Sequence, residues 1–320
     1  MKPILALALF LLSALPSSSD QPKSFRDLQW KYPRVRAASA EKDAVLRQRF
    51  QEKGLPYPPH AILLRAFKKE AVLELWAASA EDQPYVLVHE YSICTPSGVL
   101  GPKRRFGDER VPEGFYELDW FNPQSNFYLS MHISYPNASD RILGSHQNPG
   151  GDIFLHGDCA SIGCIPITDD GIKEVYWLAV LVHSQSLLNS QPSSTSSTSN
   201  SDRAVPPFAQ HPNRGQLSSP SAGHDAQASV SLTKNRVPTR GDRAPSPASH
   251  MPIEIFPARL TDASLQSLAA SHPNQPDLLA FWRNLKQGFD LFEKTHLPPR
   301  IKIDRLGSYE FSPLSARTLP

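Results

Sequence analysis

The chain of 320 residues contains few cysteines, little net charge and almost no long apolar run. Three cysteines do not suggest the dense disulfide framework of a small secreted domain. A formal net charge of +2 argues against a dedicated nucleic-acid binder, which usually carries a strong basic bias. The longest apolar run, Ile4–Leu15, is shorter than the ~20 residues that a membrane-spanning helix needs. We therefore expect no nucleic-acid partner and no stable membrane insertion.

The N-terminus has the three parts of a secretory signal peptide. Lys2 supplies a short positive region, Ile4–Leu15 the apolar region, and Pro16–Ser19 the small residues where cleavage takes place. The sequence predicts a signal peptide over residues 1–19 and an exported mature protein. A retained membrane anchor is the alternative, and the absence of a nearby cysteine argues against a lipid anchor.

The middle of the chain carries short apolar segments separated by glycine, proline and asparagine turns, which favour a mostly β core of the α+β class. Ser39 is a candidate N-cap for a helix that ends at Gly54. Lys68–Glu70 is expected to form a hairpin turn between the first two strands. Another helix begins near Thr168, with its buried face expected at Ile172, Val175, Tyr176, Ala179 and Val180. The predicted strands are Ala61–Phe67, Ala71–Trp76, Tyr85–Cys94, Phe127–Tyr135 and Ile153–Leu155.

The composition changes from Ser184 to His250, a stretch rich in Ser, Pro, Ala and Gln. Such a stretch buries too little apolar surface to offset chain entropy, so we expect disorder. Ordered patterns resume in residues 251–320, so we interpret 184–250 as an insertion within one fold. The division is 1–19 signal peptide, 20–53 N-terminal helical segment, 54–183 catalytic domain, 184–250 insertion and 251–320 C-terminal part. Beyond the insertion we expect a strand at Ile253–Phe256, helices at Leu260–Ser271 and Pro276–Thr295, and a hairpin of Arg300–Asp304 with Tyr309–Phe311.

Residues 156–164 place an imidazole and a thiol on one glycine-containing segment between a strand and a helix. A cysteine in that position, with a histidine in reach, is a plausible activated nucleophile. His156 is the expected base, and a cationic imidazole and the positive helix end near Thr168 are expected to favour the thiolate of Cys164. The N–H groups of Gly163 and Cys164 are candidates for an oxyanion hole.

Three alternatives accompany this interpretation. In the first, Cys164 is a buried structural thiol with no catalytic role. In the second, His156, Cys159 and Cys164 hold zinc with Asp158 or His132 as fourth ligand, although we expect no metal and no cofactor. The third concerns Cys159, which forms a disulfide with Cys94 and leaves Cys164 free, forms one with Cys164 and blocks catalysis, or stays unpaired like the other thiols.

These motifs resemble the signature of the L,D-transpeptidases, the YkuD-type peptidoglycan enzymes: a His-Gly pair, here His156-Gly157, and Ser-x-Gly-Cys, here Ser161–Cys164. The short spacing between them is similar to the YafK-like branch. The resemblance covers roughly 54–183 and 251–303. Further matching segments are Ser97–Lys103, Pro112–Tyr116, Tyr135–Asn137 with Asp140, and Phe281-Trp282, of which the first two resemble loops of that branch.

The resemblance implies an L,D-transpeptidase-type β-sandwich with peripheral helices, and acyl transfer on peptidoglycan stem peptides through a thioester on Cys164. Ser161 is expected to orient the histidine or to shape the turn. Ile162 stands where many members have a second histidine, and Ile165-Pro166 replaces Ile-Arg. This departure leaves open a hydrolase that cleaves the same linkage, including attached protein. A non-catalytic wall-binding module is the third possibility.

Two further residues are candidates for substrate binding. His132 lies on a predicted strand and is able to line the cleft, although a packing role is the default. Lys103 belongs to a short basic run with Arg104 and Arg105 that suits the carboxylates of stem peptides. A solvated turn is the alternative interpretation of this run.

Overall fold

The computed structural model describes residues 24–95, 97–189 and 251–314. They all belong to one compact unit, Met1–Ser190 with Ser246–Pro320. The predicted signal peptide and residues 190–250 of the predicted insertion lie outside the described residues. Among the helices that the structure describes, none has the length and apolar character to cross a membrane.

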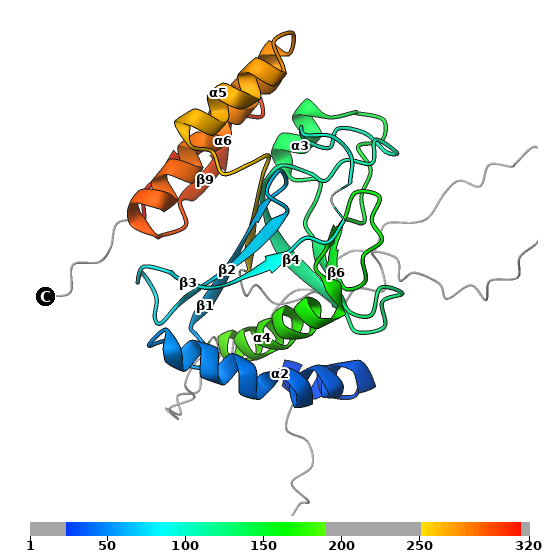
Figure 1. The fold of residues 1–320 in the computed structure, drawn as a ribbon, viewed down its shortest axis with the longest axis vertical. Helices are drawn as coiled ribbons and strands as arrows, with labels where there is room; N and C mark the ends of the chain where they lie inside the picture. The colour runs from blue at the N-terminus through cyan, green and yellow to red at the C-terminus, as the bar shows by residue number, and fades with distance from the viewer. Residues whose placement is uncertain (1–23, 96, 190–250, 315–320) are drawn as a thin grey trace, which may run out of the picture. The chain divides into compact units, whose positions relative to one another are not determined.

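An eight-stranded sheet forms the centre of the structure (Figure 1), and its strand order is β3-β2-β1-β8-β4-β5-β6-β7. A separate hairpin pairs β9 with β10. The strands are β1 (Ala61–Phe67), β2 (Val72–Ala78), β3 (Val86–Ser92), β4 (Gly114–Asn122), β5 (Ser130–Ile133), β6 (Phe154–His156), β7 (Ile165–Pro166), β8 (Pro252–Phe256), β9 (Arg300–Ile303) and β10 (Tyr309–Ser312).

Strand β8, which follows the predicted insertion in sequence, lies between β1 and β4. It runs parallel to β1, with Ile253 beside Leu64, and antiparallel to β4, with Ile255 beside Gly114. Its residues Ile253, Ile255 and Phe256 are fully buried. Residues on both sides of the predicted insertion therefore contribute to the same sheet.

The helices lie around the curled sheet, which confirms the predicted α+β, mostly β fold. Strand β4 pairs with β8 through its first half and with β5 through its second, and the register shifts between Leu118 and Trp120. The sheet is thus continuous through β4. The helices are α1 (Phe25–Trp30), α2 (Pro33–Glu52), α3 (Ala138–Leu143), α4 (Thr168–Asn189), α5 (Asp262–Ser271) and α6 (Pro276–Thr295).

Three sequence-based expectations were wrong in detail. Helix α2 starts at Pro33 rather than after Ser39, because proline is well suited to the first helical position and Ser39 is a buried residue inside the helix. Of the segment Pro112–Tyr116, expected as a loop, residues 114–116 form the start of β4. Helix α4 continues through Asn189, so the predicted boundary at Ser184 falls within a helix.

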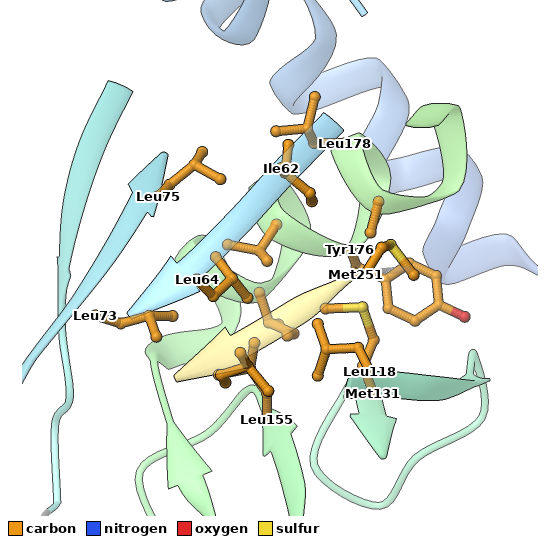
Figure 2. Close-up of a cluster of buried hydrophobic side chains, with 14 of the residues drawn as sticks. Ile62, Leu64, Leu73, Leu75, Leu118, Met131, Leu155, Tyr176, Leu178 and Met251 are labelled. Atoms are coloured by element: carbon orange, nitrogen blue, oxygen red, sulfur yellow. The ribbon is translucent and has the colours of Figure 1, made fainter. Parts of the chain in front are cut away.

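Helix α4 covers the apolar face of the sheet, and helix α2 packs against α4 (Figure 1). The expected inward residues of α4, among them Ile172, Val175 and Tyr176, are completely buried. They join one large cluster with Leu64, Met131 and other side chains of the sheet (Figure 2). Burial of each large aliphatic side chain contributes about 1.5–3 kcal/mol, so this face fixes the position of the strands that carry the site.

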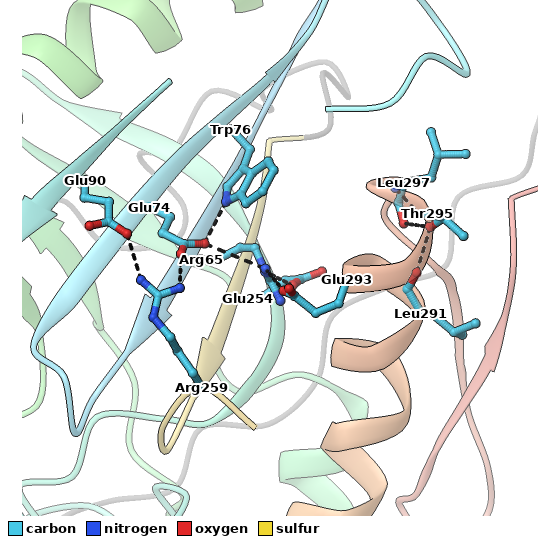
Figure 3. A network of polar contacts seen from close by, with 10 residues as sticks. All are labelled: Arg65, Glu74, Trp76, Glu90, Glu254, Arg259, Leu291, Glu293, Thr295 and Leu297. Carbon is cyan, nitrogen blue, oxygen red and sulfur yellow. Dashed lines mark hydrogen bonds and ion pairs between the residues drawn. The ribbon is translucent and has the colours of Figure 1, made fainter. Parts of the chain in front are cut away.

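Helix α6 packs on another part of the sheet, over a buried arginine. Arg65 is fully buried in β1, and its guanidinium contacts Glu254 at 3.0 Å and Glu293 of α6 at 2.7 Å (Figure 3). Trp76 donates from Nε1 to Glu74, 2.7 Å away, in the same network. Phe289 and Phe292 of α6 pack their rings against the guanidinium. Helix α6 is thus joined to the sheet by both charge and aromatic contacts.

Candidate active site

His156 is the last residue of β6, and Cys164 immediately precedes the neighbouring strand β7. Leu155 of β6 pairs with Ile165 of β7, and both side chains are buried in the core. Because side chains alternate along a strand, the residues before and after this pair point to the opposite face. The strand register thus brings the predicted thiol and imidazole to one face.

A row of side chains crosses this face at the level of Cys164. Trp120 pairs with His132 across β4 and β5, and His132 pairs with Phe154 across β5 and β6. The Phe154 ring lies 5.2 Å from the His132 ring and 5.9 Å from the Trp120 ring, between centroids. The Phe154 N–H donates to Cys164 Sγ at 3.4 Å. The row thus connects an aromatic surface to the thiol.

The His156 ring is arranged to act as an acceptor at Nε2. Its Nδ1 is hydrogen-bonded to the carbonyl of Gly157, an acceptor, so Nδ1 carries the proton. Nε2 is buried and has no hydrogen-bond partner. The Phe127 ring covers the imidazole, 4.6 Å away between centroids. Burial lowers the pKa of His156, although the Gly157 carbonyl and the charge of Asp158 oppose that shift.

Burial also determines the charge of the thiol. It raises the pKa of Cys164, the Phe154 N–H lowers this pKa, Asp152 raises it and Lys103 lowers it. A raised thiol pKa beside a lowered imidazole pKa favours a neutral pair at neutral pH. These shifts oppose the expected thiolate beside a cationic imidazole, because burial disfavours the charged form of each group.

Ser161 shapes the turn that carries Cys164. Its Oγ donates to the Cys164 carbonyl at 2.8 Å and accepts from the Gly163 N–H at 3.3 Å. Gly163 has φ +128°, and a Cβ there would be 3.2 Å from the Arg110 carbonyl oxygen. Of the two roles considered for Ser161, these contacts favour the turn, and they engage one of the two N–H groups proposed for the oxyanion hole.

Gly157 permits a close approach of helix α4 to the histidine strand. A Cβ on Gly157 would lie 2.6 Å from Asp169 Oδ1 and 2.9 Å from the Phe127 carbonyl oxygen. Asp169 Oδ1 accepts from the Asp158 N–H at 2.8 Å. Glycine is therefore required at this position by packing, next to the residue expected to act as base.

The structure pairs Cys94 with Cys159 in a disulfide and leaves Cys164 free. This is the first of the two pairings considered above. It joins the segment between His156 and Cys164 to the chain just beyond β3. It also removes Cys159 from the alternative zinc set, because a disulfide sulfur is not a thiolate ligand. The described residues contain no group of three or more potential metal ligands.

The two candidate substrate-binding residues are both buried and both paired. His132 Nδ1 lies 2.6 Å from Asp119 Oδ1, and the Asp119 side chain is 46% exposed. Lys103 Nζ forms an ion pair with Asp108 at 2.6 Å and donates to the Arg105 carbonyl. Lys103 is thus neither a solvated turn residue nor a free cation. His132 lies in the row beside Phe154, whereas Lys103 binds other residues of its own loop.

Several residues of the site carry no clear signal in the sequence. Phe127 and Phe154 both fall in predicted strands, and only the folded structure shows that Phe127 adjoins the imidazole and Phe154 the thiol. A cavity of about 1080 Å³ lies elsewhere, between β4, β8 and the β9 region, and neither Cys164 nor His156 lines it. Cavity size alone would have directed attention away from the thiol.

Comparisons with known proteins identify relatives of the chain. No protein-family model matches the chain. The chain is 30% identical over 244 residues to the protein named "Putative L,D-transpeptidase YafK" from Escherichia coli K12, covering 76% of this chain and 70% of that protein. The same figures apply to the Escherichia coli O157:H7 protein of that name.

Two solved structures are also similar. The helical cell shape determining protein Pgp2 from Campylobacter jejuni shares 14% identity and a TM-score of 0.35, over 76% of this chain and 73% of that one. Bd1075 from Bdellovibrio bacteriovorus shares 23% identity and a TM-score of 0.27, over 36% and 42%. The relationship rests on the YafK sequences, whose match extends over most of both chains. This chain therefore belongs to the YafK branch of the L,D-transpeptidase family.

Proposed function

We propose that this protein is a periplasmic, cysteine-dependent L,D-transpeptidase that acts on peptidoglycan stem peptides through a thioester. One observation carries the proposal: the free thiol, Cys164, shares a sheet face with His156, whose buried Nε2 has no partner. A buried nitrogen without a hydrogen-bond partner lowers stability, and a role in catalysis explains why the fold retains it. Export through residues 1–19 belongs to the same proposal, because the substrate lies outside the cytoplasm.

The first half of the reaction forms the thioester. Neutral His156 takes the proton of Cys164 at Nε2 while the sulfur attacks the carbonyl carbon of the stem-peptide linkage. The tetrahedral intermediate collapses, the C–N bond breaks, and His156 returns the proton to the leaving amine. The Gly157 carbonyl holds Nδ1–H and so keeps the acceptor at Nε2.

The two groups need to approach each other for this step. His156 Nε2 makes no hydrogen bond in the structure, and catalytic hydrogen bonds are often long without substrate. The Cys164 N–H remains a candidate donor to the developing oxyanion. The Gly163 N–H, which donates to Ser161 here, joins it only if that contact opens.

The second half transfers the acyl group to an acceptor. An amine or a water molecule loses its proton to His156 Nε2 and attacks the thioester carbonyl; the C–S bond then breaks, and the sulfur of Cys164 takes the proton back from His156. We propose that the row of Trp120, His132 and Phe154 binds substrate beside the thiol, with the half-exposed carboxylate of Asp119 at its edge. The row offers a substrate apolar contact area, and Asp119 adds a carboxylate at its edge.

One observation favours hydrolysis as the second candidate. Pro166 pairs with His156 across β6 and β7 and supplies no charged group, at the position where the resemblance leads one to expect arginine. Without a cation there, an acceptor peptide has one fewer anchoring contact. Water then competes more effectively for the same thioester.

A muropeptide digest tests both candidates. Purified peptidoglycan sacculi are incubated with the mature protein and with Cys164→Ala, and the products are compared by liquid chromatography and mass spectrometry. New cross-linked masses with the active protein alone establish a transpeptidase. Shortened stem peptides or released attached protein, without new cross-links, establish a hydrolase. Identical profiles would reject both and favour a wall-binding module.

A further inference from the structure

A buried cluster outside the site joins helix α6 to the loop that covers the Cys164 turn. We name Lys68, Glu113 and Trp282 the anchor cluster. Glu113 and Trp282 are fully buried, and the Lys68 side chain is 7% exposed. They come from three separate parts of the chain, namely the β1–β2 turn, the residue before β4, and α6. Three such distant residues meet only in the folded protein.

Every polar group of the anchor cluster is engaged. Lys68 Nζ donates to the carbonyls of Gly101 and Val111, each at 2.9 Å, and to Glu113 Oε1 at 2.8 Å. Glu113 Oε1 also accepts from the Gly101 N–H at 2.8 Å. Glu113 Oε2 accepts from Trp282 Nε1 at 2.7 Å. The cluster thus binds the segment Ser97–Glu113 near both of its ends.

The same segment lies against the turn that carries the nucleophile. Ser161 Oγ approaches Ser97 Oγ at 3.5 Å, and the Arg110 carbonyl faces Gly163. A small cavity of about 40 Å³ is lined by Lys68, Val111 and Ile165, the residue after Cys164. Lys103, whose charge acts on Cys164, belongs to the segment as well. Displacement of the segment would therefore change both the geometry and the surroundings of the thiol.

We propose that Lys68, Glu113 and Trp282 are positioning residues, which hold Ser97–Glu113 against the Ser161–Cys164 turn and make the reactivity of Cys164 depend on helix α6. The effect of this positioning on catalysis rests on the proposed function, whereas its effect on the reactivity of the Cys164 thiol does not. A one-ångström displacement of a reacting group costs up to about 10²-fold in rate. Removal of one buried hydrogen bond at Trp282 is expected to produce part of that loss.

Two tryptophans offer a matched comparison. Trp282→Phe deletes an indole donor to a buried carboxylate at 2.7 Å, and Trp76→Phe deletes the same kind of donor to Glu74 at the same distance. Trp76 contacts α6 through Phe292 but belongs to the Arg65 network (Figure 3), not to the loop over Cys164. Both variants are expected to lower the Tm by similar amounts.

The measurement is the rate of Cys164 alkylation by iodoacetamide against pH, in full-length oxidised protein and well below the Tm. Cys164 is the free thiol, so the signal comes from one sulfur. Trp282→Phe is expected to move the midpoint of the pH dependence of Cys164 alkylation to lower pH, because a loosened segment exposes the thiol to water. The rate of acylation by a muropeptide is expected to fall about tenfold or more. Trp76→Phe is expected to retain the wild-type values for both rates.

If the alkylation profile and the acylation rate change in both variants, or in neither, the proposal is overturned. A hydrogen bond that only stabilises the fold would affect Cys164 no more in one variant than in the other. If Trp282→Phe fails to fold, Glu113→Gln, which keeps the size of the side chain, takes its place. If alkylation shifts in Trp282→Phe alone while wild type forms no acyl-enzyme, the positioning role stands and the proposed function fails.

Discussion

Cys164 directly precedes β7 and His156 ends the adjoining strand β6, both on the face of the sheet opposite Leu155 and Ile165. Their relationship is set by strand register, and the turn between them is fixed by Ser161 and by the Cys94–Cys159 disulfide. The core that holds Leu155 and Ile165 therefore also holds the proposed catalytic pair.

The charge state of the pair predicts a pH profile. Burial raises the pKa of Cys164 and lowers the pKa of His156. Alkylation of Cys164 should accordingly rise with pH only in the alkaline range, later than for a free cysteine in an unfolded peptide. Acylation should rise as His156 loses its proton, at a pH below the ordinary histidine range. An alkylation rate that stays high down to acidic pH would show a thiolate–imidazolium pair instead.

The close approach at Gly157 predicts a sharp effect of one methyl group. Gly157→Ala forces a Cβ against Asp169 and the Phe127 carbonyl, and overpacking of this kind costs about 1–3 kcal/mol. Gly151→Ala is the control, because nothing lies within 4 Å of its added Cβ. Chemical denaturation should show a loss for Gly157→Ala alone. Equal stability of the two variants would mean that α4 does not press on this strand.

The disulfide predicts a link between oxidation and the site. Reduction of Cys94–Cys159 releases a loop with a sequence separation of 65 residues and should cost about 2–4 kcal/mol of stability. Intact mass should increase by two hydrogen atoms, and acylation should slow, because the released segment runs from His156 to Cys164. Cys94→Ser should reproduce both effects in the absence of reductant. An unchanged acylation rate would show that the strands alone position the pair.

The Arg65 network predicts pH-dependent stability. Burial raises the pKa of Glu254 to about 6, against the opposing charge of Arg65. Since the folded protein holds this proton more tightly than the unfolded chain, the contribution is present at acidic pH and is lost as pH rises through about 6. Between pH 5 and 7, wild type should lose about 1–2 kcal/mol relative to Glu254→Gln. A constant difference between the two would contradict the shift.

The sequence predicted those features that depend on local pattern. The spacing of apolar residues in α4 and α6 specified two helices, and Lys68–Glu70 marked a hairpin. The motif brought attention to His156 and Cys164 because both lie within nine residues. Features that depend on pairing between distant strands could not be predicted from the sequence. The central place of β8, and the row from Trp120 to Phe154, require a register that no local pattern contains.

Charge states were the other point at which the sequence was insufficient. A histidine beside a cysteine suggested an ion pair, yet burial raises the pKa of Cys164 and lowers the pKa of His156, which favours the neutral forms. Lys103 likewise read as a surface cation because Arg104 and Arg105 follow it, and it is buried against Asp108. Burial of a polar residue depends on what the rest of the chain places over it.

The most direct test of the account is the covalent state of Cys164. Mature protein is incubated with a disaccharide tetrapeptide, quenched in acid and analysed by intact mass and peptide mapping. We predict an acyl adduct on Cys164 in wild type, none in Cys164→Ala, and formation slowed by about 10²–10⁴-fold in His156→Ala. A folded wild-type protein that forms no adduct, or forms one at another residue, would contradict the account.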